Sequence, residues 1–66
     1  MNIKNIREKA GVTQIELAKA LNIGQSAVAA WETGQALPRA DKLIQIAEVL
    51  NCTVDDLLRG EENAKE

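Results

Sequence analysis

The feature that most restricts the fold of this chain is a break of three residues, Asn22-Ile23-Gly24, between two segments of helical apolar spacing. A capping box, Thr13 with Glu16 three residues later, predicts where the first segment starts. Three residues allow only a tight turn, and Asn tolerates the positive φ of such a turn better than other non-glycine residues. The sequence therefore predicts two helices, over about 14–21 and 25–33, that cross at a steep angle.

A small side chain is needed where two steeply crossed helices touch, and Ala18 supplies it in the first of the two. The apolar residues of the pair are expected to attach it to the other helices. They are Leu17, Leu21, Ile23, Val28 and Trp31. The outer side of the second helix is then left without a partner inside the protein.

Apolar spacing and helix-stop residues predict three further helices. One runs over about 2–10 and ends at Gly11, one runs over about 40–50, and one is capped by Thr53 and closed by Gly60. With no Phe or Tyr and a single Trp, the core must be filled by aliphatic side chains. The core positions expected in these helices are Ile3, Ile6, Ala10, Leu43, Ile44, Ala47, Leu50, Val54, Leu57 and Leu58.

The expected fold class is all-α, a compact domain of five short helices over residues 1–60. Residues 61–66 are charged and have no apolar partner, so they are expected to form a disordered tail. A chain of 66 residues holds one domain at most, with little surface to bury.

The composition excludes several classes of function. The sequence has no His and a single Cys, Cys52. We therefore interpret Cys52 as a small buried hydrophobe in a reducing cytoplasm, and not as a reactive or metal-binding residue. An enzyme is not expected, because there is no His, no Tyr and no cluster of carboxylates outside the tail. No cofactor, metal or small-molecule ligand is expected either. No apolar run reaches the roughly 20 residues of a membrane span, and no signal peptide is present, so a cytoplasmic location is expected.

The outer face of the helix over 25–33 carries only short side chains, either polar or ending in a methyl group. They belong to Gln25, Ser26, Ala29, Ala30 and Thr33. Such a face lets a helix enter a DNA major groove, where Gln can pair with the N6 and N7 edge of adenine and Ala can contact a thymine methyl. The competing interpretation is a helix rich in Ala only because Ala favours helices.

Net charge argues against a polyanionic partner, because DNA affinity depends on Lys and Arg that neutralise phosphates. The chain has 8 basic and 10 acidic side chains, a net charge of -2. Three Glu and one Lys lie in residues 61–66, which leaves seven cations and seven anions in residues 1–59. A neutral domain still binds DNA if its cations share one face.

Three stretches of the sequence, IREKAGVTQIELAKALNI, GQSAVAAWETG and LIQIAEVLNCTVDDLL, resemble the phage-repressor and Cro-like helix-turn-helix proteins, often called the XRE family. The resemblance covers about residues 3–58. It implies a lambda-repressor-like fold and a sequence-specific transcriptional regulator of double-stranded DNA, which we expect to be a repressor. A homodimer on palindromic half-sites is expected because one short domain offers few phosphate contacts.

The resemblance implies roles for individual residues as well. In the family, the positions of Gln25, Ser26 and Ala30 read base edges, and Ala29 is exposed nearby. Phosphate contacts fall at the start of one helix and after the recognition helix, and their residues are Thr13, Gln14, Thr33, Gln35 and Arg39. Arg7 and Glu32 match positions that form an internal ion pair in relatives, with a phosphate contact by Arg7 as the alternative.

The sequence departs from the family pattern in the turn and in the phosphate contacts. Asn22 stands where the family has glycine, and Gly24 stands where it has a Ser or Thr cap, and both substitutes suit these positions. Residues 34–38 lack the Lys or Arg that relatives often carry there, which predicts weak phosphate anchoring.

Useful affinity for DNA is expected to need two copies of the domain. The apolar residues available for pairing are Leu37, Val54 and Leu58, unless they complete the core. The alternative function is a protein-interaction adaptor or an antitoxin-like module, because the same helical fold does not fix one activity. Binding to duplex DNA at low salt discriminates between the two functions.

Overall fold

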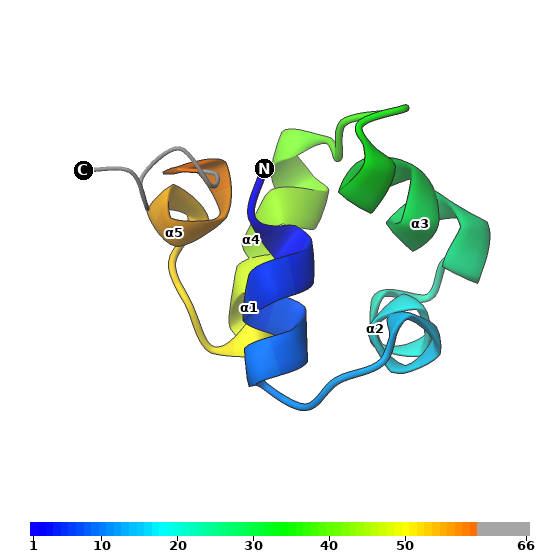
Figure 1. Ribbon diagram of the computed structural model, residues 1–66, viewed down its shortest axis with the longest axis horizontal. Coiled ribbons are helices and arrows are strands. Elements are labelled where there is room, and N and C mark those ends of the chain that lie inside the picture. The colour runs from blue at the N-terminus through cyan, green and yellow to red at the C-terminus, as the bar shows by residue number, and fades with distance from the viewer. Residues whose placement is uncertain (60–66) are drawn as a thin grey trace.

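The computed structural model describes residues 1–59 and contains five helices (Figure 1). They are α1 (Ile3–Lys9), α2 (Gln14–Leu21), α3 (Gln25–Thr33), α4 (Ala40–Leu50) and α5 (Val54–Arg59). No strand occurs within residues 1–59. The predicted all-α class and the five helices are confirmed, and the tail expected at 61–66 lies outside the described residues.

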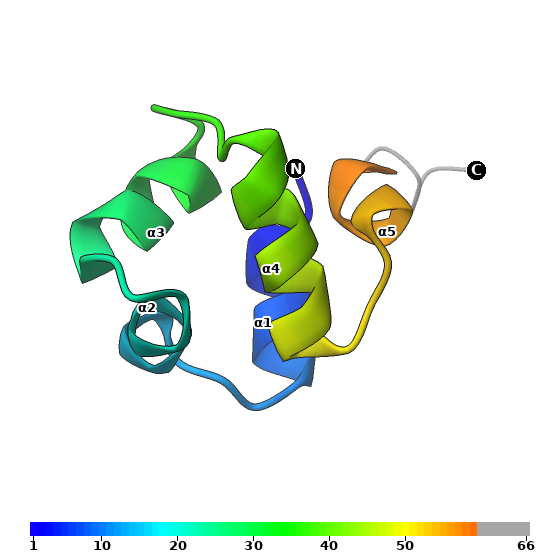
Figure 2. The ribbon, with the colours of Figure 1, turned by 180° about the vertical axis from the view of Figure 1, so that it is seen from behind.

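Helices α1 and α4 lie in the middle of the molecule, with α5 on one side and α2 and α3 on the other (Figure 1 and, from behind, Figure 2). Helix α2 packs against both α3 and α4, α5 packs against α4, and α1 contacts α3. Helix α3 therefore lies at an edge of the molecule, where α1 and α2 hold one of its sides.

Side-chain caps fix the starts of α2 and α5. The Thr13 hydroxyl accepts from the Glu16 amide at 3.0 Å, and the Glu16 carboxylate accepts from the Thr13 amide at 2.9 Å. In the same way, the Thr53 hydroxyl accepts from the Asp56 amide at 2.9 Å, and the Asp56 carboxylate accepts from the Thr53 amide at 3.1 Å. These bonds satisfy first-turn amides that the helix itself cannot satisfy, so the predicted capping residues are confirmed.

The turn between α2 and α3 has the predicted geometry. Asn22 is left-handed, with φ 60° and ψ 45°, and the Ile23 amide donates to the Ala18 carbonyl at 3.0 Å. Gly24 follows in an extended conformation and precedes the first residue of α3. Ala18 is 3% exposed, in the helix that packs most closely on α3, which agrees with its predicted place at the crossing.

Aliphatic side chains and one tryptophan fill the core. The buried apolar residues are Ile3, Leu17, Ala18, Leu21, Val28, Trp31, Ile46, Ala47, Leu50 and Leu57. The expected burial of Ala10 and Leu58 was wrong. Ala10 caps the C-terminal end of α1 and is exposed, and Leu58 of α5 is 53% exposed.

The predicted core face of α4 was also partly wrong. Ile44 is 54% exposed, whereas Ile46 is completely buried and was missed. The inward stripe of α4 runs through Leu43, Ile46, Ala47 and Leu50, the i, i+3, i+4, i+7 spacing of one helix face. This face lies against both α2 and α5, and Ile44 falls to the side of it.

A buried ion pair joins α1 to α3. Arg7 Nε donates to Glu32 Oε2 at 2.6 Å and Arg7 Nη1 donates to the Val12 carbonyl at 2.7 Å, and the Arg7 and Glu32 side chains are 9% and 4% exposed. Glu32 Oε1 accepts from Arg7 Nη2 at 3.3 Å and from Gln14 Nε2 at 2.8 Å. One carboxylate thus connects α1, the start of α2 and the end of α3.

Both members of this pair are charged at neutral pH. Burial opposes ionisation of Glu32, but the hydrogen bonds from Arg7 and Gln14 and the positive charge of Arg7 outweigh it, so the pKa of Glu32 lies below its ordinary 4.5. The hydrogen bond to Glu32 raises the pKa of Arg7 in spite of desolvation. Loss of either partner leaves the other charge buried and unpaired, which typically costs about 3–5 kcal/mol.

Enlarging Ala18 should destabilise the domain. The larger side chain of Ala18→Leu must fit between α2 and α3, and overpacking of this kind costs about 1–3 kcal/mol. Ala20→Leu, on the exposed side of the same helix, is the matched control and should leave the free energy of unfolding within about 0.5 kcal/mol of the wild type. Urea unfolding measures both variants, and equal stabilities would show that the crossing has room to spare.

Acid should weaken the link made by Glu32. Because its pKa is lower in the folded protein than in the unfolded chain, its contribution to stability is complete above about pH 4.5 and is lost as pH falls through the lower folded pKa. Glu32→Gln removes this titration. The stability difference between wild type and Glu32→Gln should therefore be largest near neutral pH and should shrink below about pH 4.5, in urea unfolding at several pH values. A difference independent of pH would contradict the assignment.

Candidate nucleic-acid interface

The open side of α3 carries the residues predicted to read bases. Gln25 and Ser26 are exposed in its first turn, and Ala29 and Ala30 are half-buried one turn later. Helix α3 contains no Lys or Arg, and its large apolar side chains, Val28 and Trp31, are buried. The exposed surface is therefore narrow, uncharged and built from short side chains, which allows close approach to the edges of base pairs.

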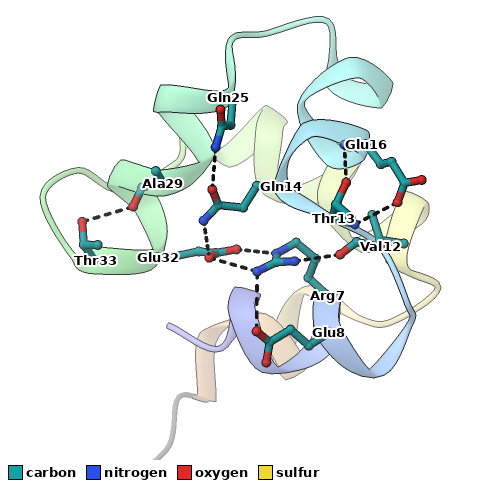
Figure 3. A network of polar contacts seen from close by, with 10 residues as sticks. All are labelled: Arg7, Glu8, Val12, Thr13, Gln14, Glu16, Gln25, Ala29, Glu32 and Thr33. Atoms are coloured by element: carbon teal, nitrogen blue, oxygen red, sulfur yellow. Dashed lines mark hydrogen bonds and ion pairs between the residues drawn. The ribbon is translucent and has the colours of Figure 1, made fainter.

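A chain of hydrogen bonds fixes the side chain of Gln25 (Figure 3). Gln25 Nε2 donates to Gln14 Oε1 at 3.0 Å, and Gln14 Nε2 donates in turn to Glu32 Oε1 at 2.8 Å. Gln14 is the first residue of α2 and Gln25 is the first residue of α3, so the starts of the two helices meet. The sequence does not predict this contact, because no local pattern pairs residues on different helices.

The start of α2 offers hydrogen-bond donors beside Gln25. The Thr13 hydroxyl oxygen accepts from Glu16, which leaves the hydroxyl proton for another partner. The first-turn amides of a helix point outward at the positive end of its dipole, which favours an anion. An open hollow of about 430 Å³ connects this region with the start of α3. Its lining residues are Arg7, Glu8, Gly11, Val12, Thr13, Gln14, Ile15 and Gln25.

The other predicted phosphate contacts follow the end of α3. The Thr33 hydroxyl donates to two carbonyls of its own helix, at 3.1 and 3.3 Å, so it must rotate before it can donate to a phosphate. Gln35 is exposed. The Arg39 side chain is 89% exposed and lies 3.9 Å from Asp41, a distance and exposure that make a weak pair. Arg39 is therefore free to contact another anion.

Among residues 1–59, the other two arginines are engaged in close ion pairs. Arg7 lies in the buried pair with Glu32, and Arg59 contacts Asp55 at 2.8 Å on α5. Arg39 is thus the one described arginine near the end of α3 whose charge is not closely paired.

The described residues show no arrangement for metal chemistry. No group of three or more His, Cys, Asp or Glu within residues 1–59 is placed to hold a metal ion. Burial and the nearby Asp56 raise the pKa of the Cys52 thiol, which keeps it protonated and unreactive. Within the same residues, no helix has the length and apolar character needed to cross a lipid bilayer.

Comparisons with known proteins identify the family of this chain. A family model described as helix-turn-helix matches residues 3–57. The chain is 38% identical over 97% of its length to the uncharacterized HTH-type transcriptional regulator YqaE of Bacillus subtilis, of which it covers 55%. It is 36% identical over 96% of its length to the HTH-type transcriptional regulator ImmR of the same organism, of which it covers 50%.

A phage protein is among the relatives too. The chain is 29% identical over 89% of its length to Repressor protein C2 of Salmonella phage P22, of which it covers 27%. It spans between 27% and 55% of the length of the curated relatives that it matches. No solved structure matches it. Because the family model extends from the start of α1 into α5, the chain belongs to the XRE-type, phage-repressor-like helix-turn-helix family.

Proposed function

We propose that this domain is a transcriptional regulator that binds double-stranded DNA sequence-specifically, with α3 as the recognition helix in the major groove. The open face of α3, small and uncharged beside the donors at the start of α2, is the observation that carries this proposal. The printed names of the relatives, transcriptional regulators and a repressor, support it. We expect repression rather than activation.

The contacts divide between base edges and phosphates. We assign base reading to Gln25, Ser26, Ala29 and Ala30, because they form the open face of α3. We assign phosphate contacts to the residues that flank it, which are Thr13, Gln14, Thr33, Gln35 and Arg39. One Nε2 hydrogen of Gln14 is used by Glu32 and the other is available to a phosphate. Arg7 is held by Glu32 and has a structural role.

Most of these phosphate contacts come from neutral donors. Neutral donors orient a protein on DNA but displace few counterions, whereas each cation that neutralises a phosphate contributes about 0.9 to the salt dependence of binding. With Arg39 as the one cation in the set, affinity should change only weakly with salt. Discrimination among sequences then depends mainly on the fit of α3 to base edges.

We further propose a homodimer that binds palindromic half-sites about 34 Å apart. Two exposed leucines are available for pairing, Leu37 with 73% and Leu58 with 53% of its surface exposed. Val54, the third candidate, is half-buried and packs against the core, so its side chain supports the fold instead. A second copy doubles the contacts of a domain that has few cations.

Gln25→Ala and Arg39→Ala should weaken DNA binding in different ways. Gln25→Ala should lower affinity for the preferred site by about 1–3 kcal/mol and relax the preference at one base pair. Arg39→Ala should weaken binding to every duplex alike and reduce the salt slope by about 0.9. Fluorescence anisotropy with a site selected from random duplexes and with a scrambled duplex measures both effects at several salt concentrations.

Equal losses on the selected and scrambled duplexes for both variants would show that the division of contacts is wrong. A wild-type protein that ignores duplex DNA at low salt would favour the adaptor function. The same titration therefore tests the function and the assignment of residues.

The exposed leucines can be tested with a matched control. Leu37→Gln and Leu58→Gln each replace an apolar side chain on a surface proposed to pair by a neutral polar one. Ile44→Gln makes the same change at an exposed residue of α4 outside that surface. A leucine that pairs should, when replaced, reduce cooperative binding to two half-sites and leave binding to one half-site unchanged. Sedimentation of the protein with both duplexes measures this, and wild-type monomers on a two-half-site duplex would refute the dimer.

A further inference from the structure

We propose that Glu32, acting through Gln14, fixes which way round the Gln25 side-chain amide points and so makes Gln25 select adenine over guanine. The inference rests on the proposed function and concerns how that same site chooses a base. The proposal makes Glu32 and Gln14 positioning residues for base selection.

The chain of bonds starts from a group that can only accept. An ionised carboxylate has no proton to donate, and Glu32 faces donors on two sides, with Arg7 Nε at 2.6 Å and Gln14 Nε2 at 2.8 Å (Figure 3). The Glu32 side chain is 4% exposed, so water has little access to replace either donor. Gln14 must therefore turn its NH₂ group toward Glu32.

The orientation of Gln14 then decides that of Gln25. With its NH₂ group on Glu32, Gln14 presents Oε1 to Gln25, and the 3.0 Å contact requires an N–H from Gln25. The oxygen and nitrogen ends of an amide have nearly the same size, so packing does not distinguish the two orientations. Gln25 is exposed as well, so the hydrogen-bond partner is what fixes its amide.

Gln25 is left with one orientation toward the groove. Its Oε1 is free to accept and its second Nε2 hydrogen is free to donate. Adenine offers the matching pair, a donor at N6 and an acceptor at N7, whereas guanine offers acceptors at both N7 and O6. Guanine would place its O6 against the Gln25 oxygen and leave two acceptors facing each other without a proton.

Replacing Glu32 by Gln should reverse the chain. The oxygen of the new amide stays with Arg7, whose donor is the closest, and its NH₂ group then faces Gln14. Gln14 must turn its oxygen to residue 32 and its NH₂ group to Gln25, which accepts with Oε1. Both hydrogens of Gln25 Nε2 then point outward, an arrangement that suits the two acceptors of guanine.

The test measures relative affinity for adenine and guanine at the base pair where Gln25→Ala loses its preference. Sites are selected from random duplexes with the wild type, and each variant is titrated in anisotropy below its measured unfolding transition. We expect the wild type to prefer adenine by roughly 5- to 150-fold, the range for one good bidentate pair. Glu32→Gln should reduce this ratio roughly tenfold or reverse it.

Arg7→Lys is the matched control. It weakens the same buried pair and lowers stability, but it keeps Glu32 as an ionised acceptor. The adenine preference should therefore stay at the wild-type ratio even where the melting temperature falls. A purely structural role for Glu32 would instead lower both the stability and the ratio in Arg7→Lys and in Glu32→Gln.

A double variant should restore the original orientation. In Gln14→Glu with Glu32→Gln, the amide at position 32 donates to the carboxylate at 14, which again accepts from Gln25. The adenine preference should return, although the new carboxylate near the phosphates lowers affinity for every duplex. Gln14→Met removes both side-chain hydrogen bonds of residue 14 and leaves the ion pair between Arg7 and Glu32 in place. Its ratio of adenine to guanine affinity should fall toward one.

The outcomes are separable. The proposal is overturned if Glu32→Gln keeps the wild-type ratio of adenine to guanine affinity. It is also overturned if Arg7→Lys loses as much of the adenine preference as Glu32→Gln does, or if the double variant does not regain that preference. If Glu32→Gln does not fold, an unchanged ratio in Gln14→Met overturns it instead. Failure of the proposed function looks different, because the wild type itself would then bind no duplex or distinguish none.

Discussion

The buried ion pair between Arg7 and Glu32 holds together the part of the fold on which the interface depends. Its carboxylate is nearly inaccessible to solvent and is satisfied from two helices, by Arg7 of α1 and Gln14 of α2, while it belongs to the last turn of α3. A domain of this size has few core side chains, so a single buried contact among three helices is a large share of what fixes their positions. Helix α3, at the edge of the molecule, is positioned by this contact and by its packing on α2, where Ala18 is buried.

In the proposed interface, the same carboxylate links stability to recognition. The hydrogen bonds that satisfy it continue through Gln14 to Gln25, the first residue of α3 and an exposed one. In a domain with many cations, attraction to phosphates supplies much of the affinity, and small errors in base contacts are tolerated. In the proposed interface the flanking donors are almost all neutral, so we expect the orientation of a few hydrogen-bonding groups to contribute correspondingly more to the selection among sequences.

The domain corresponds to only one part of the longer relatives that it matches. The relatives that it matches are longer, and the chain covers about half or less of most of them. What the domain shares with them is the five-helix unit, from α1 into α5. The exposed leucines, Leu37 and Leu58, lie outside α1, α2 and α3.

Local chemistry in the sequence was enough to determine the helices. The capping residues Thr13 and Thr53 and the left-handed Asn22 act through bonds to neighbours a few residues away, so the helix boundaries and the turn followed from adjacent letters. Tertiary structure alone decided which face of α4 is buried, with Ile46 inside and Ile44 outside, because that depends on where α2 and α5 lie. It also decided that residues 14 and 25, each placed by sequence at the start of a helix, meet through their side chains. Such a contact depends on how two helices cross, and no periodicity within either helix contains that information.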